Sequence, residues 1–164
     1  MARSKIKHFK GFSIVDGDIR VTLNMNRFER QFQQAQYQLD GDVMNSMVPF
    51  MPMVTGSFIN ATRAASAAVQ GSGEVYAAYG PQGRFLYEGK TMVDEKTGST
   101  WARRGAKKVL VSEFGGKTNA KPDLTYTKQA HPKAQSHWFD AAKKADGKKW
   151  IRDAKRTAGG GQRG

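Results

Sequence analysis

Residues 26–52 read NRFERQFQQAQYQLDGDVMNSMVPFMP, and this stretch contains the clearest structural element that the sequence predicts. Its apolar positions recur every three or four residues, at Phe28, Phe32, Ala35, Leu39, Val43 and Met47. Such spacing places them on one face of an α-helix. Asn26 with Glu29 three residues later is typical of a capping box, and Pro49 and Pro52 predict where the helix ends. A methionine run follows the same stretch and fits core packing better than an adaptable partner surface: Met44, Met47, Met51 and Met53.

The chain before this helix is predicted to be an arm and a short hairpin, together residues 1–25. Residues 1–12 are basic with scattered aromatic side chains. In residues 13–23, Asp16-Gly17 separates two short β-prone runs, which is a turn signal of β-hairpins.

The middle of the chain predicts further small elements. Thr55 can cap a short helix, and residues 64–69 and 74–79 flank a Gly-Ser-Gly sequence, which predicts a second β-hairpin. The polar, glycine-containing stretch 94–121 is predicted to be an extended loop or long hairpin that is mobile. Within it, residues 108–112 favour one short strand.

The last third predicts a strand, a helix and a tail. Residues 124–127 alternate like a strand, a helix is expected from His131-Pro132 onward, and residues 158–164 form a glycine-rich tail expected to be flexible. We therefore expect an α+β fold, in which the long N-terminal amphipathic helix and the C-terminal helix pack on a small antiparallel sheet. Residues 26–157 are expected to form a single domain.

Charge is the most informative bulk property. The chain of 164 residues carries 27 Lys and Arg against 14 Asp and Glu, a net charge of +13. The usual partner of so basic a surface is a polyanion such as nucleic acid. The chain has no cysteine, which fits a reducing compartment, and no apolar run approaches the length of a membrane span. We expect a protein made in a cytoplasm, without a membrane.

Two clusters concentrate the positive charge. The first comprises Arg103, Arg104, Lys107 and Lys108, and the second comprises Lys144, Lys148, Arg152 and Lys155. The spacing of the second cluster places four cations along one helix face. That face is either a phosphate-facing stripe or a solvated surface, since non-specific phosphate contact needs only clustered cations. Nothing indicates sequence-specific base readout.

The sequence offers no arrangement of residues that indicates catalysis. His131 and His137 are six residues apart, which does not place them together on one helix face. The few close carboxylate pairs fall in predicted turns, loops or polar helix faces, where a shifted pKa is not expected. We therefore expect neither an enzyme, such as a nuclease, nor a metal or other cofactor.

Four segments, in this order, resemble the minor capsid and tail-completion proteins of siphophages, which sit in the neck between head and tail. They are the helix end at residues 47–52, the Val-Thr-Gly-Ser-Phe sequence at 54–58, the Gly-Pro…Arg-Phe…Tyr…Gly-Lys block at 78–90, and the His-Pro…Trp-Phe…Ala-Ala segment at 131–142. The resemblance covers roughly residues 26–157 but excludes the stretch 94–121. The matched positions with an expected structural role are Pro52, Thr55, Gly56, Phe58, Gly80, Pro81, Tyr87, Gly89, His131, Pro132 and Trp138.

The resemblance implies an α+β structural protein that does not catalyse a reaction. It implies a homo-oligomeric ring, usually six-fold and in some members twelve-fold, around the DNA channel of the virion neck. Such a ring contacts a neighbouring neck protein on the head side and a tail-terminator ring on the tail side. The alternative from the residues alone is a free, basic, cytoplasmic nucleic-acid-binding protein, which explains the charge but not the order of the segments.

Overall fold

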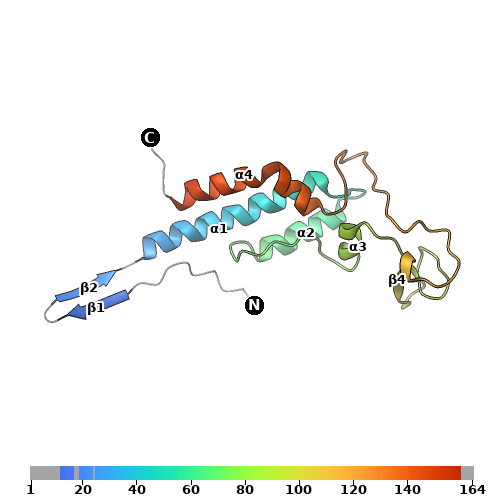
Figure 1. Ribbon diagram of the computed structural model, residues 1–164, viewed down its shortest axis with the longest axis horizontal. Coiled ribbons are helices and arrows are strands. Elements are labelled where there is room, and N and C mark those ends of the chain that lie inside the picture. The colour runs from blue at the N-terminus through green and yellow to red at the C-terminus, as the bar shows by residue number, and fades with distance from the viewer. Residues whose placement is uncertain (1–11, 17–18, 24, 160–164) are drawn as a thin grey trace. The chain divides into compact units, whose positions relative to one another are not determined.

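A computed structural model describes residues 12–16, 19–23 and 25–159, and it confirms the predicted α+β class (Figure 1). The arm residues 1–11 and the tail residues 160–164 lie outside the described residues. In chain order the elements are β1 Phe12–Asp16, β2 Ile19–Leu23, α1 Asn26–Met47, the 3₁₀ turn η1 Val48–Phe50, α2 Ser57–Ala68, α3 Gly83–Glu88, β3 Met92–Asp94, β4 Lys108–Leu110, the 3₁₀ turn η2 Val111–Glu113 and α4 Trp138–Ala158. The predicted N-terminal helix is confirmed as α1, and its proline-containing end becomes η1.

The strands form two separate antiparallel pairs instead of one sheet. β1 pairs with β2, with Phe12 opposite Leu23, which confirms the predicted N-terminal hairpin. β3 pairs with β4, with Val93 opposite Val109, so residues 95–107 are the connection of a second hairpin. The strand predicted at 108–112 is shorter, because η2 replaces its last two residues.

The chain divides into two compact units. Unit 1 comprises residues 1–46, 63–76 and 142–164, and unit 2 comprises residues 47–62 and 77–141. Each unit is thus assembled from segments distant in sequence. Helices α1, α2 and α4 each contribute residues to both units.

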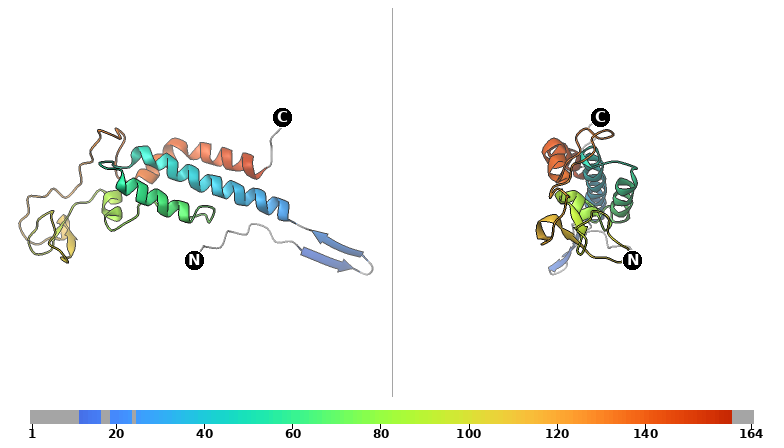
Figure 2. Two further views of the ribbon diagram at one scale, coloured as in Figure 1. Left: turned by 180° about the vertical axis from the view of Figure 1, so that it is seen from behind. Right: turned by 90° about the vertical axis from the view of Figure 1, so that its right-hand side faces the viewer.

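In unit 1, the residues of α2 and α4 run antiparallel to α1 (Figure 2). Near the C-terminal end of α1, Trp150 Nε1 donates to Ser46 Oγ at 3.1 Å, whereas further back Thr157 Oγ1 donates to Gln38 at 2.7 Å. The segment after α2 contacts the first half of α1, as expected for an antiparallel pair, because the Gln70 side-chain amide donates to the Tyr37 carbonyl at 2.8 Å. These paired contacts fix the register of the helices.

Gly41 of α1 lies close to that last contact. A Cβ on Gly41 would lie 2.7 Å from the Gln70 amide nitrogen, the far end of a flexible side chain, so a larger residue would make that side chain shift. The helix is continuous through Gly41. The residue therefore lies at a close approach of two segments.

The buried face of α1 contains Ala35, Asp40, Met44 and Met47, each exposed by 6% or less. Met51, after the helix, is also buried, so three of the four methionines predicted to be core residues are buried, whereas Met53 is half-buried. The predicted apolar stripe is only partly buried, because Phe28 at its start is 48% exposed.

Asp40 is a buried carboxylate that holds the turn after α2. It accepts the backbone N–H groups of Gly71 at 2.7 Å and Gly73 at 3.1 Å, and also the Gln36 amide at 2.8 Å. Gly71 and Gly73 have φ values of 89° and 79°, a region that favours glycine. A buried carboxylate needs such donors, because an unpaired charge is costly in a protein interior.

The hairpin predicted from residues 64–69 and 74–79 is wrong. The first run lies largely in α2, which extends the short helix expected after Thr55, and the second run is not a strand. In unit 1, the Tyr76 N–H donates to Ser66 Oγ at 3.1 Å, and in unit 2 the Tyr79 N–H donates to Thr62 Oγ1 at 3.2 Å. Residues 76 and 79 thus donate their backbone N–H groups to side-chain hydroxyls of α2 and not to a neighbouring strand.

Two predictions near the C-terminus are also wrong. Residues 124–127 form no strand, and only Asp123 makes an isolated bridge, to Lys90. The last helix begins at Trp138 and not at His131-Pro132, because His137 has a φ of 49°, which an α-helix does not accommodate. The His137 N–H instead donates to the Tyr87 carbonyl at 2.8 Å.

Candidate functional site

The first predicted basic cluster lies on the β3–β4 hairpin of unit 2, and its members differ in role. Arg103 forms an ion pair with Asp94, and Lys108 Nζ donates to the Thr100 carbonyl at 2.9 Å. Arg104 and Lys107 are exposed and make no ion pair with the described residues. Only these two cations of the cluster are fully available to a partner.

Asp94 organises this hairpin from the end of β3. Its fully buried carboxylate accepts the backbone N–H groups of Lys96 at 2.8 Å and Thr97 at 3.0 Å. It also accepts Arg103 Nε at 3.1 Å, Nη2 at 3.2 Å and the Arg103 backbone N–H at 3.3 Å. The bidentate Arg103 pair, followed by the Lys96 N–H, holds the pKa of this carboxyl well below its usual range.

This network holds a hairpin, which is one of the two alternatives predicted for the stretch 94–121, whereas the predicted mobility stays a prediction. Gly98, with a φ of 67°, donates to the Asp94 carbonyl at 2.9 Å and closes the turn. Thr118 Oγ1 in turn donates to the Gly98 carbonyl at 2.6 Å, which ties the chain after β4 to the turn. Sequence reasoning missed this role of Asp94, because it placed the pair Asp94 and Glu95 in a loop, where no shifted pKa was expected.

Because the pKa of Asp94 is lowered by folding, its contribution to stability should have a defined pH dependence. The contribution is complete above the unfolded-state pKa of about 3.9 and decreases progressively as the pH falls from there through the lower native pKa. We expect the Lys96 and Thr97 amides to stay protected from hydrogen exchange down to about pH 4, and to lose protection below it. NMR-detected exchange measures this directly.

Asp94→Asn is the matched variant for that measurement. It removes the charge but keeps one acceptor, so exchange at these amides should be faster by on the order of tenfold at neutral pH. The acid-induced loss should disappear in the variant. Equal pH profiles of the two proteins would show that Asp94 does not hold the hairpin.

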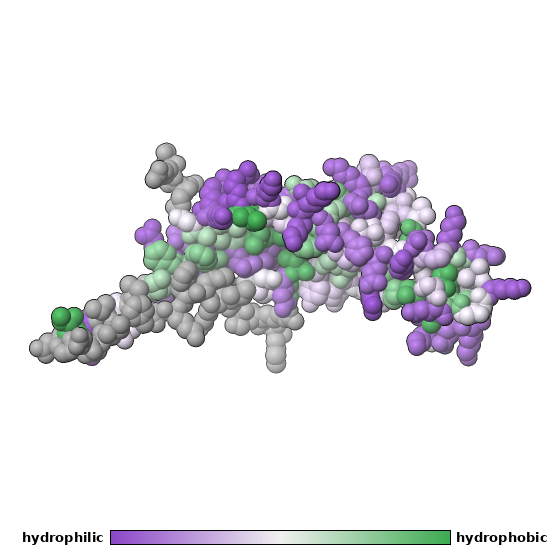
Figure 3. Space-filling model, in the orientation of Figure 1, coloured by the Kyte–Doolittle hydropathy of each residue, from purple (hydrophilic) through white to green (hydrophobic). Residues whose placement is uncertain are grey.

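The second predicted cluster lies on α4 in unit 1, and the structure leaves it open to solvent. Lys144, Lys148, Arg152 and Lys155 are all exposed, and hydrophilic side chains gather over α4 in Figure 3. The opposite side of the helix carries the buried residue Trp150. The predicted one-faced arrangement of cations is therefore present.

The ion pairs of α4 reduce this positive charge only slightly. Asp153, 7% exposed, lies 3.3 Å from Arg152 and 3.5 Å from Arg156. Lys144, Lys148 and Lys155 have no carboxylate partner among the described residues. A row of solvated ammonium groups is suited to non-specific contact with a phosphate backbone.

The residues singled out by the family resemblance come together in unit 2. Trp138 is fully buried, with its ring 5.9 Å from that of Phe58 and 4.9 Å from that of Tyr87, both edge-on. Its Nε1–H donates to the Ala77 carbonyl at 2.7 Å. Three of the four matched segments thus meet at one indole ring.

The remaining matched positions lie in loops and turns of unit 2. His131 Nδ1 lies 2.8 Å from the Met51 carbonyl, which joins the first matched segment to the last. Gly56, Gly80 and Gly89 have φ values of 80°, 99° and 72°. Thr55 Oγ1 accepts the Ser57 N–H at the start of α2, at 3.4 Å. Pro52, Pro81 and Pro132 lie in the irregular segments between the elements.

Comparisons with known proteins identify no relative of the chain. No protein-family model, curated protein or solved structure matches the chain. Within the described ranges, no three His, Asp or Glu side chains are grouped so that they could hold a metal ion. The described helices include none with the length and apolarity that a membrane crossing requires.

Proposed function

We propose that this chain is a structural protein of a tailed-phage neck, which forms a ring around the DNA channel and joins the head to the tail. In this role it has no catalytic activity. It is made in the cytoplasm of the bacterial host and ends in the virion, in contact with a neighbouring neck protein and with the tail terminator.

The observation that carries the proposal is the convergence of the matched segments in unit 2. Phe58, Tyr87 and Trp138 are separated by up to 80 residues in the chain, yet their rings form one cluster. If the chain has the fold of that family, one fold accounts both for the matched residues and for their contacts in the core. A chance similarity of four short sequences gives no reason for such a meeting.

The charge distribution supports the same proposal. Seven cations of α4 are exposed, namely Lys143, Lys144, Lys148, Lys149, Arg152, Lys155 and Arg156. A ring that surrounds passing DNA needs attraction without base recognition, which phosphate contacts provide. The free nucleic-acid-binding alternative uses the same cations but leaves the matched segments unexplained.

The experiment that tests the proposal uses the phage whose genome encodes this chain. In electron cryomicroscopy of the virion, the chain should occupy ring density between head and tail. Deletion of its gene should yield DNA-filled heads and separate tails. Intact virions after deletion, or absence of the chain from purified virions, would refute the neck assignment and favour the free nucleic-acid-binding protein.

A further inference from the structure

An exposed indole lies on the β3–β4 hairpin of unit 2. Trp101 is 86% exposed, whereas the other two tryptophans of the chain, Trp138 and Trp150, are 0% and 7% exposed. Its backbone N–H donates to Ser99 Oγ at 3.1 Å, within the turn that Asp94 holds through the N–H groups of residues 97 and 103. No aromatic or cation–π contact to this ring is present among the described residues. The indole is therefore open to a flat partner from outside.

Positive charge exceeds negative charge on the exposed surface of the same stretch. Asp94 is buried and paired with Arg103. The other charged residues of 94–121 are exposed, and only Glu95 and Glu113 among them are negative. The exposed cations besides Arg103 are Lys96, Arg104, Lys107, Lys108, Lys117 and Lys121. The partner that complements this surface is therefore an anion.

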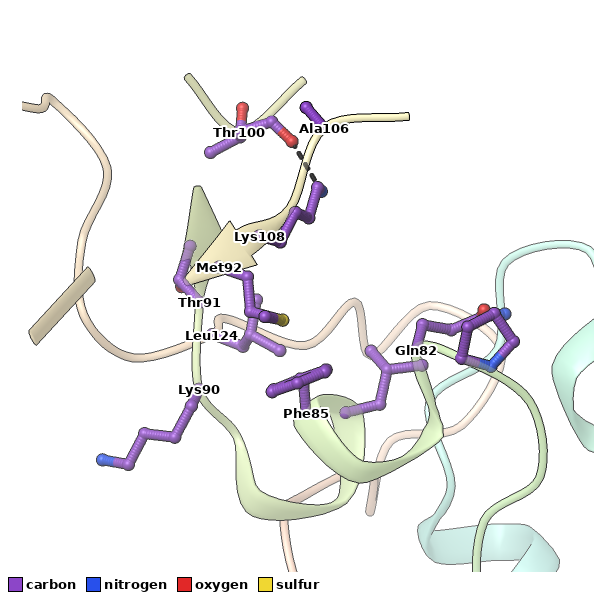
Figure 4. Close-up of a pocket in the computed structure, with 11 residues that line it drawn as sticks. Gln82, Phe85, Lys90, Thr91, Met92, Thr100, Ala106, Lys108 and Leu124 are labelled. Atoms are coloured by element: carbon purple, nitrogen blue, oxygen red, sulfur yellow. Dashed lines mark hydrogen bonds between the residues drawn. The ribbon is translucent and has the colours of Figure 1, made fainter. Parts of the chain in front are cut away.

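Two of these cations come from other segments to Thr100, the residue before Trp101. Lys108 Nζ donates to the Thr100 carbonyl at 2.9 Å (Figure 4), and its ammonium group has two further N–H groups. Lys117 and Thr100 line the same hollow, which has a volume of about 570 Å³. Its other lining residues are mostly polar and include Asn119 and three residues with hydroxyl groups. Cations, polar groups and an open indole thus adjoin one another.

We propose that this surface binds single-stranded nucleic acid, with one unpaired base stacked on Trp101 and the adjoining phosphates at Lys108 and Lys117. Aromatic stacking combined with cations along the backbone is how proteins bind single strands without reading their sequence. The hollow of about 570 Å³ lies within the roughly 300–1,000 Å³ of small-ligand pockets, so it can receive a sugar-phosphate unit. A duplex offers the indole no such partner, because its bases are stacked within the helix.

An acidic protein segment matches the cations but not the indole. The face of an aromatic ring carries partial negative charge, so it attracts a nucleobase ring in offset stacking and does not attract a carboxylate. The proposal goes beyond the neck function and does not depend on it. The duplex contact expected of α4 involves cations of unit 1, whereas the indole and its neighbouring cations belong to unit 2.

Tryptophan fluorescence of the full chain tests the stacking directly, because Trp101 is the one exposed tryptophan of the three. Oligo-dT of about 12 nucleotides should quench its emission. An oligomer of the same length that lacks bases should quench far less. Both oligomers carry the same phosphates, so any binding to α4 contributes equally to the two titrations. Oligo-U should also quench, since DNA and RNA share the base face, and a clear preference for either strand would support the proposal and identify the nucleic acid.

Substitution of the indole should act on the single strand alone. In fluorescence anisotropy with labelled oligomers, Trp101→Ala should weaken oligo-dT binding by roughly 5- to 150-fold, the range expected for one stacked base. Binding of the base-free oligomer and of a duplex should be unchanged. Trp101→Phe retains a ring and should restore part of the loss. Val54→Ala, which alters a side chain that is 85% exposed elsewhere in unit 2, should have no effect.

Replacing Lys108 and Lys117 with glutamine tests the phosphate contacts. Each contact to a single strand contributes about 0.7 to the slope of log K against log salt concentration, so the double variant should lower the slope by about 1.4. Quenching at saturation should remain, because Trp101 is unchanged.

Equal quenching by oligo-dT and by the base-free oligomer would overturn the proposal, as would an unchanged affinity for oligo-dT after Trp101→Ala. Stronger quenching by a glutamate peptide of the same charge would overturn it as well, and would assign the surface to an acidic protein. These outcomes leave the neck assignment standing, because that is tested on virions.

Discussion

Replacing Trp138 with alanine should destabilise unit 2 by about 3–5 kcal/mol, the usual cost of truncating a buried tryptophan. The ring is fully buried between Phe58 and Tyr87, so its removal leaves a cavity where three distant segments meet. The Ala77 carbonyl also loses its indole donor. Urea denaturation followed by circular dichroism measures the change in the free energy of unfolding.

Two other tryptophan variants make the comparison specific. Trp138→Phe retains an aromatic ring but loses the hydrogen bond to Ala77, and should be intermediate in stability. Trp101→Ala removes an exposed indole and should change the free energy of unfolding by less than about 0.5 kcal/mol. Equal effects of the alanine substitutions at Trp138 and Trp101 would contradict the assignment of Trp138 as the centre of unit 2.

A helix was predicted correctly where apolar side chains make up most of its buried face. In α1 the apolar period of three and four residues identifies the helix, even though the buried face also includes Asp40. The N-terminal hairpin was predictable because a local turn signal determines it.

The second half of α2 was mispredicted because the buried face of this helix includes small polar residues. Thr62 and Ser66 are 0% and 5% exposed, so the face has a helical period that hydrophobicity does not reveal. Their hydroxyls accept backbone N–H groups of residues 76 and 79, partners that only the folded chain brings within reach. Hydrophobicity and turn residues alone therefore led to the prediction that residues 64–69 and 74–79 pair as two strands.

The basic clusters illustrate the same limit for function. Sequence identified all eight cations, and the four on α4 are exposed together as predicted. It could not reveal that Arg103 is engaged by Asp94, because the ion pair depends on the hairpin register. One cluster is therefore partly structural, and α4 is the stronger candidate for DNA contact.

Replacing Lys144, Lys148, Arg152 and Lys155 with glutamine should weaken binding to duplex DNA and make it less dependent on salt. Each phosphate contact contributes about 0.9 to the slope of log K against log salt concentration, so the loss of four contacts should reduce the slope by about 3 to 4. Fluorescence anisotropy at several salt concentrations, with duplexes of unrelated sequence, measures that slope. The reduction should be the same for every duplex, because phosphate contacts carry no sequence information.

The control must have the same net charge. Lys96, Lys117, Lys121 and Lys128 are exposed cations of unit 2, and their replacement with glutamine removes as much charge as the α4 variant does. If DNA contacts the α4 face, the control should retain most of the slope. If both variants lose the same slope, attraction arises from the net charge of +13 and not from α4. Binding to DNA would then be a property of the overall charge of the protein and not of one helix face.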